Sequence, residues 1–129
     1  MRIFLTALVA IAVHPVLAQE VEIPRATEAC AIVASYAAGL SKTAEILGGG
    51  EVGREPYKAE SLDMIRSEVT IEFDNLGRRS TARCLISWGI FNGEALDIAI
   101  VDRIEVDGEE VDEMTSALAM GKLNRALQN

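Results

Sequence analysis

Three arginines are the residues of this sequence best suited to bind a charged partner. Arg78, Arg79 and Arg83 form its one basic cluster, in a chain with 20 acidic and 12 basic residues. Guanidinium groups pair well with carboxylates and other anions, so the cluster is a candidate docking patch for an acidic protein or an anionic glycan. The alternative interpretation is that the arginines pair with nearby acids, such as Asp102, and protect a strand from edge-to-edge association.

Two aromatic residues near a predicted turn form the second candidate site. Trp88 and Phe91 lie just before Asn92-Gly93, the dipeptide most typical of a tight hairpin turn. Aromatic side chains at a hairpin tip are suited to anchor a protein interface. The alternative is that both close one end of a hydrophobic core, in a chain that has one Trp and three Phe.

An acidic stretch between Asp102 and Glu113 holds seven carboxylates and suggests a calcium site. The EF-hand pattern fails, however, because with Gly108 at its invariant glycine the first ligand position falls on Arg103 and the twelfth on Met114. We interpret the stretch as a solvated strand edge, a turn and the start of a helix.

The sequence predicts no catalytic residue, no cofactor and no metal site. Its single histidine, His14, lies in the N-terminal segment that we expect to be removed. The remaining chain then has no histidine for a Ser-His-Asp or Cys-His mechanism or for a histidine-ligated metal. The triplet Gly48-Gly49-Gly50 lacks the lysine and the strand context of a phosphate-binding loop.

The first 18 residues have the pattern of a cleaved secretory signal peptide. Arg2 is followed by an apolar run from 3 to 13, and Ala18 supplies a small residue at the cleavage site. The run is shorter than the roughly 20 residues that span a bilayer. Gln19, not the cysteine of a lipoprotein, follows the predicted cut. We therefore expect a bacterial periplasmic or secreted protein with no membrane anchor after cleavage.

The expected mature chain, 19–129, has the length of one small domain. It keeps all 20 acidic residues, so it would repel nucleic acid and anionic membrane surfaces. Its two cysteines, Cys30 and Cys84, lie 54 positions apart and form no CxxC motif. In an oxidising compartment they predict one structural disulfide.

The periodicity of apolar residues predicts two helices around a set of strands. Residues 27–47 repeat at helical spacing, with Thr27 as a plausible N-cap, and Asp112 is a plausible N-cap for a final helix. The segment 48–63 contains glycines and Pro56 and predicts a loop or linker, which is long for a compact domain; the alternative is that it contains a short element. Alternation predicts strands at 64–73, 79–91 and 96–106, with turns at 74–77, 92–93 and 107–108 and a short stub near Val111.

These elements predict an α+β fold with an N-terminal helix, a three- to four-stranded antiparallel meander and a C-terminal helix. Cys30 lies on the apolar stripe of the first helix and Cys84 on a strand face with Trp88, so the bridge would join helix to sheet. A strict two-residue turn at 92–93 places apolar residues on both faces of the sheet. Either both faces are covered, or a bulge near Gly89 shifts the register.

The function predicted from these features is that of a non-enzymatic module that binds a protein or cell-envelope partner. One alternative is a small secreted hydrolase or enzyme inhibitor, and another is a self-associating structural subunit. The sequence identifies neither the partner nor the oligomeric state.

Overall fold

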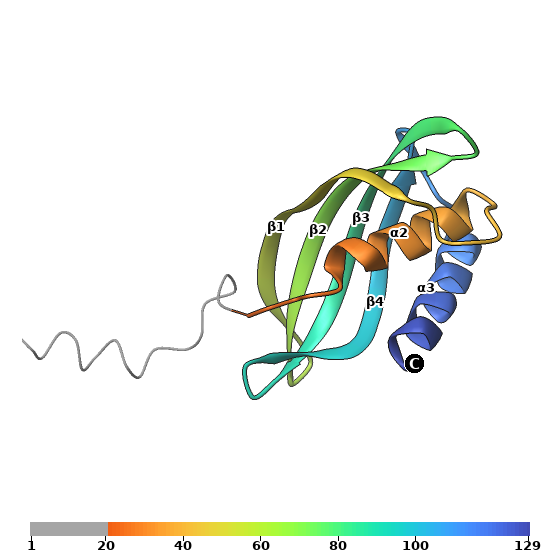
Figure 1. Ribbon diagram of the computed structural model, residues 1–129. Coiled ribbons are helices and arrows are strands. Elements are labelled where there is room, and N and C mark those ends of the chain that lie inside the picture. The colour runs from red at the N-terminus through yellow and green to blue at the C-terminus, as the bar shows by residue number, and fades with distance from the viewer. Residues whose placement is uncertain (1–20) are drawn as a thin grey trace, which may run out of the picture.

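The computed structural model describes residues 21–129 and shows two helices with one antiparallel sheet (Figure 1). The predicted signal peptide lies outside the described residues. The sheet has five strands in the order β1-β2-β3-β4-β5. The elements are α2 (Ala26–Ala37), β1 (Ile46–Ala59), β2 (Leu62–Asn75), β3 (Arg78–Phe91), β4 (Glu94–Val106), β5 (Glu109–Glu110) and α3 (Glu113–Leu127). The α+β class is confirmed; within residues 21–129 the sheet has five strands, where the sequence predicted three to four.

Helix α2 is shorter than the predicted helix of 27–47. It ends at Ala37, and Gly39 follows with a positive φ of 82°, a conformation that glycine adopts without the steric cost of a side chain. The chain then leaves the helix, although Leu40 and Ala44 still pack partly against the core. Leu40 and Ala44 are therefore spaced in the sequence like residues on one face of a helix, but in the structure they lie in a loop. The first helix also begins without a side-chain cap, because Arg25 rather than Thr27 is its N-cap residue.

The loop predicted at 48–63 was wrong. Most of this segment belongs to strand β1, and its last residues begin β2. Strand β1 forms the edge of the sheet and pairs with β2 along its length, with two register shifts that mark bulges. Glycine and proline indicate a loop in most sequences, but both occur on edge strands. Gly49 is required there, since a Cβ atom at this position would lie 2.2 Å from the carbonyl oxygen of Thr70.

The predicted turns are confirmed as tight hairpin turns whose two central residues have positive φ values. Asn92 and Gly93 have φ values of 54° and 79°, and Asp107 and Gly108 have 52° and 86°. Leu76 and Gly77 adopt the same conformation between β2 and β3. These turns give the right-handed twist that antiparallel hairpins need, so consecutive strands pair as neighbours.

The predicted register conflict is resolved by irregularities in β4. Near the hairpin tip Phe91 pairs with Glu94, but Trp88 pairs with Ala99 and Leu85 with Arg103. The register shifts twice, once in the segment opposite Gly89 and once between Leu85 and Ile86. The first shift lies near Gly89, where the sequence suggested a bulge, but it displaces the register by two residues and leaves the alternation of β4 unchanged. The second shift, by one residue, turns Ile104 to the buried face that carries Val101 and Trp88.

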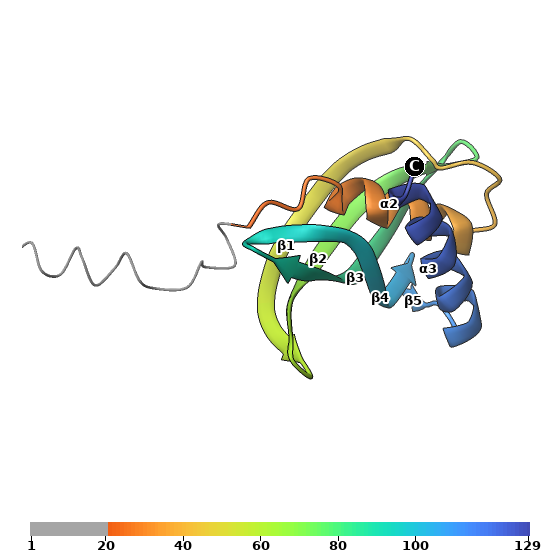
Figure 2. The ribbon, with the colours of Figure 1, turned by 90° about the horizontal axis from the view of Figure 1, so that it is seen from below.

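Both helices pack on one side of the sheet, so the core lies between them and the inner face of the strands (Figures 1 and 2). The sheet curves around α2, and α3 lies beside β4 (Figure 2). The predicted disulfide between Cys30 and Cys84 is confirmed, with a Cα–Cα distance of 5.7 Å. It ties α2 to β3 at the centre of the core, where both cysteines are buried.

Helix α3 covers the free edge of β4. Asp112 caps the helix as predicted, and its side chain accepts a hydrogen bond from the backbone N–H of Thr115. The side chain of Asn124 accepts from the N–H of Ala99 and donates to its C=O, both at 2.8 Å. These are the two bonds that a neighbouring strand would make with Ala99, so a helix side chain takes the place of a further strand.

Candidate functional site

The face of the sheet that points away from the helices is covered by neither of them (Figure 2). We call it the outer face. Alternate residues of β2, β3 and β4 point to it, while their neighbours fill the core. Its two halves differ in chemistry: the end near the β1–β2 and β3–β4 turns is apolar, and the remainder is charged.

We call the first half the apolar patch. Its members are large apolar side chains that are exposed and that come from three strands: Leu62, Phe91, Leu96, Ile98 and Ile100. Leu62, Phe91 and Ile98 are the most exposed of these, at 63%, 66% and 61%. Single exposed apolar residues are common on proteins, but a contiguous group marks a surface that contacts something else.

The local backbone builds the apolar patch. Ile98 and Ile100 flank the buried Ala99, so the alternation of β4 turns both isoleucines away from the core. Gly89 leaves space for Leu96, because a Cβ atom at position 89 would lie 3.2 Å from Leu96 Cδ1. Met64, which pairs with Gly89 across the strands, is buried beneath this region.

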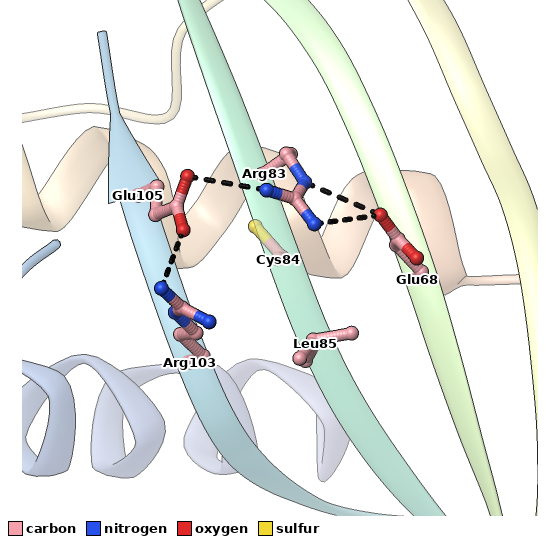
Figure 3. Close-up of a pocket in the computed structure, with 6 residues that line it drawn as sticks. All are labelled: Glu68, Arg83, Cys84, Leu85, Arg103 and Glu105. Carbon is pink, nitrogen blue, oxygen red and sulfur yellow. Dashed lines mark hydrogen bonds and ion pairs between the residues drawn. The ribbon is translucent and has the colours of Figure 1, made fainter. Parts of the chain in front are cut away.

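The charged half carries a series of ion pairs that we call the ladder (Figure 3). Arg83 lies between Glu68 at 3.1 Å and Glu105 at 3.4 Å. Glu105 also pairs with Arg103 at 2.9 Å, so the charges alternate across β2, β3 and β4. Cross-strand pairs of opposite charge stabilise a sheet by roughly 0.2–1 kcal/mol each. The space beside Leu85 that these residues line is about 10 Å³, enough for one water molecule.

Two of the three arginines of the predicted basic cluster are paired with acids of the sheet itself. Arg83 belongs to the ladder, and Arg79 pairs with Glu72. The charge of Arg78 contributes to the lowered pKa of Asp107, after the hydrogen bonds from Thr81 and Ser80. Asp102, which the sequence suggested as a partner of the cluster, accepts hydrogen bonds from Arg66 and Ser87 instead.

The two candidate aromatic residues point to opposite faces of β3. Trp88 is buried in the core with 2% exposure, so it is not available to a partner in this fold. Its Nε1 donor has no hydrogen-bond acceptor among the described residues. Phe91 lies on the outer face and belongs to the apolar patch.

A polar cluster on the inner face of β1 was not predicted. Glu51 pairs with Arg54 and accepts a hydrogen bond from Ser67 at 2.7 Å, and Arg54 donates to the carbonyl oxygen of Val21. Burial raises the pKa of Glu51, but the hydrogen bonds from Arg54 and Ser67 outweigh it, and the pKa lies below its usual range. The sequence offered no signal for this cluster once its segment was interpreted as a loop.

The acidic stretch from Asp102 to Glu113 is engaged in local contacts. Asp107 accepts from the backbone N–H of Thr81 and from the Ser80 hydroxyl, which lowers its pKa. Hydrogen bonds from Thr115 likewise lower the pKa of Asp112 at the start of α3. Within residues 21–129 no group of three or more His, Cys, Asp or Glu side chains lies close enough to hold a metal ion.

Two wider depressions lie on the surface. One on the outer face, beside Arg66 and Leu85, has a volume of about 210 Å³, below the roughly 300 Å³ of a small ligand pocket. The other is an open depression of about 470 Å³ at the C-terminal end of α3, lined by Asn124, Arg125 and Gln128 among others. Neither depression brings a nucleophile together with a base.

Comparisons of the chain with models of protein families, with curated proteins and with solved structures found no match. Over the range that the structure describes, neither helix has the length and apolar character needed to cross a bilayer.

Proposed function

We propose that this chain is a non-enzymatic binding module of the bacterial cell envelope, exported by a cleaved signal peptide at 1–18. It contacts a protein or envelope partner through the apolar patch on the outer face of its sheet. The observation that carries the proposal is the exposure of five large apolar side chains together, on the one face that neither helix covers. Burying such side chains stabilises a complex by roughly 25 cal/mol per Å² of apolar surface removed from water.

The edges of the sheet are less suited to binding than its outer face. β1 has two bulges, contains Pro56 and points the charged side chains of Glu51 and Arg54 inward. Bulges, proline and inward charges are the features by which natural edge strands resist pairing with another chain. Along β4 the edge is occupied by Asn124 of α3. A partner is therefore more readily accepted on the outer face than as an added strand.

The hydrolase alternative has less support. A general acid at neutral pH needs a carboxyl whose pKa is raised. Glu51, Asp107 and Asp112, the carboxyls with a clear shift, all have a lowered pKa.

The proposed location outside the cytoplasm is supported by the disulfide. A disulfide is typical of proteins outside the cytoplasm, where no reducing system opens it. The bridge between Cys30 and Cys84 thus supports export, and so does the N-terminal sequence pattern.

The proposal is tested by affinity capture from the cell envelope with matched variants. The wild type is compared with Phe91→Ser, Ile98→Ser, which removes two exposed members of the apolar patch without touching the core. The control is Leu76→Ser, an equivalent loss of an 86% exposed apolar side chain at the opposite end of the sheet. Thermal unfolding of each variant verifies that it is folded.

We expect a defined partner with the wild type and with Leu76→Ser, and its loss with the patch variant. Equal capture by all three proteins would refute the proposed site. A mass in solution that rises with concentration, and does so only when the patch is intact, would instead assign the patch to self-association.

A further inference from the structure

We propose that Met120 is a site of reversible oxidation, and that its oxidation releases helix α3 from the edge of β4. The oxidant is a peroxide, and the product is methionine sulfoxide. The proposal goes beyond the proposed function, because it concerns the strand edge that α3 covers and not the apolar patch. It is drawn from the way in which one stripe of α3 contacts the backbone of β4.

Three side chains of α3 bond to backbone groups on the edge of β4, and we call them the edge row: Met120, Asn124 and Gln128. They are spaced by four residues, so they lie along one face of the helix. In the same order, their partners in β4 are Val101, Ala99 and Asp97. Alternate residues of a strand point their N–H and C=O groups to the same edge, so the edge row takes the place of a neighbouring strand.

Met120 is the member of the edge row that a peroxide can change. Its Sδ accepts a hydrogen bond from the backbone N–H of Val101, with 3.4 Å between nitrogen and sulfur. A lone pair of this sulfur attacks one oxygen of hydrogen peroxide, so that an S–O bond forms while the O–O bond breaks. The sulfur loses two electrons to the peroxide, whose second oxygen leaves with both protons as water. The amide side chains of the edge row do not react in this way.

The three methionines of the described residues differ in their access to solvent. Met64 is buried, with 5% exposure, and Met114 is 74% exposed near the start of α3. Met120 lies between these extremes and packs against the core from a partly buried position. Both cysteines are joined in the disulfide, so they offer no thiol that would react first. We therefore expect peroxide to oxidise Met114 fastest, Met120 more slowly and Met64 slowest.

A sulfoxide does not fit the place of the Met120 thioether. An N–H···O hydrogen bond alone spans about 2.9 Å, so the 3.4 Å between Val101 N and Met120 Sδ leaves no room for an oxygen bonded to the sulfur. Oxygen on the other lone pair puts a polar group on a side chain that packs against the core. Both products displace Met120 from β4.

The remaining anchors of α3 are few, so the loss of one contact weakens the hold of the helix on the strand. Within α3 the buried side chains are Ala119, Leu123 and Leu127. An uncovered strand edge is the part of a sheet most ready to pair with another chain. Oxidation of Met120 thus converts a covered edge into an open one, and enzymatic reduction of the sulfoxide closes it again.

Peroxide treatment of the purified chain, with its disulfide intact, tests the proposal. Peptide mass spectrometry measures the oxidation of each methionine, and hydrogen exchange at the amides of Val101 and Ala99 measures the opening of the edge. The Met114→Leu variant leaves Met120 as the most accessible methionine of 21–129. Met120→Leu is the matched control, since leucine has a similar volume and is not oxidised. Each protein is compared with itself before and after treatment.

We expect the amide hydrogens of Val101 and Ala99 to exchange at least about tenfold faster after oxidation, in the wild type and in Met114→Leu. Exchange in Met120→Leu should not respond to peroxide. The amide of Val69, in the centre of the sheet between β1 and β3, should not respond in any of the proteins. A methionine sulfoxide reductase should restore slow exchange, because it converts the sulfoxide back to the thioether.

Four results would overturn the proposal. Met120 that stays a thioether while Met114 is fully converted would not be an oxidation site. Oxidised Met120 with unchanged exchange at Val101 would show that its contact does not hold the helix. Acceleration that persists in Met120→Leu would assign the effect to another methionine. Equal acceleration at Val69 would show that oxidation unfolds the domain instead of releasing α3.

Discussion

At the scale of single residues, three side chains hold the helices in place: Cys30 and Cys84 join α2 to β3, and Asp112 caps the start of α3. Cys30, Cys84 and Asp112 do what their types and positions indicated, because a disulfide and a helix cap depend on residue type and local spacing. The tryptophan and the phenylalanine were assigned together to one hairpin tip. The structure places them on opposite faces of the sheet. Side chains alternate along the regular strand β3, and Trp88 and Phe91 are three residues apart, so they point in opposite directions.

The inner cluster of β1 provides a test of acid stability. Because the pKa of Glu51 in the folded chain lies below its ordinary value of 4.5, its contribution to stability is complete above about pH 4.5. It is lost as the pH falls through the folded-state pKa. We expect Glu51→Gln to lower the free energy of unfolding by about 1–3 kcal/mol at pH 7, since Arg54 and Ser67 lose a charged acceptor.

Urea unfolding at neutral and acid pH measures this effect. The difference in unfolding free energy between wild type and Glu51→Gln should narrow as the pH falls from 4.5 through the lowered folded-state pKa, because the wild-type carboxyl then becomes protonated. Glu55→Gln, an exposed neighbour on the same strand, serves as the control and should change little. A difference for Glu51→Gln that stayed constant with pH would show that the cluster acts through packing and not through charge.

At the scale of elements, the strands joined by tight turns were predictable, and the segment from 38 to 59 was not. Alternation and the turn dipeptides located β2, β3 and β4 to within a few residues. The helix was extended too far because Leu40 and Ala44 lie at helical spacing but pack from a loop. β1 was missed because an edge strand with bulges, glycines and Pro56 has neither a clean alternation nor a continuous apolar face.

The disulfide is expected to be the strongest single link between a helix and the sheet. The Cys30→Ala, Cys84→Ala variant should lower the free energy of unfolding by about 2–5 kcal/mol, since the bridge closes a loop of 54 residues in the unfolded chain. Chemical unfolding of the oxidised wild type and the variant measures it. Unfolding midpoints that coincide would show that the packing of α2 alone holds it against β3.

Asn124 is expected to hold α3 on the edge of β4. Asn124→Ala removes both hydrogen bonds to Ala99, a buried residue, and should cost about 1–3 kcal/mol. The exchange of the Ala99 amide hydrogen should accelerate with it. Gln128→Ala removes one bond from an exposed residue to Asp97 and should have a smaller effect. If both variants behaved alike, the edge of β4 would not depend on the amide pairing described here.

For the whole molecule, the fold class was predictable and the functional face was not. Apolar residues on both sides of β4 predicted either a sheet covered twice or a bulge. The bulge exists, yet Leu96, Ile98 and Ile100 remain exposed, because both helices pack on the inner face. Which face a helix covers depends on contacts between residues far apart in the sequence, and periodicity carries no such information.

The central claim, that the apolar patch is the contact surface, is tested most directly by site-specific photo-crosslinking in the intact envelope. A photoreactive phenylalanine analogue is placed at Ile98 in one variant and at Leu76 in another, two exposed apolar positions at opposite ends of the sheet. We predict a discrete crosslinked product from position 98 and none from position 76. The same products from both positions, or none from position 98, would contradict the claim.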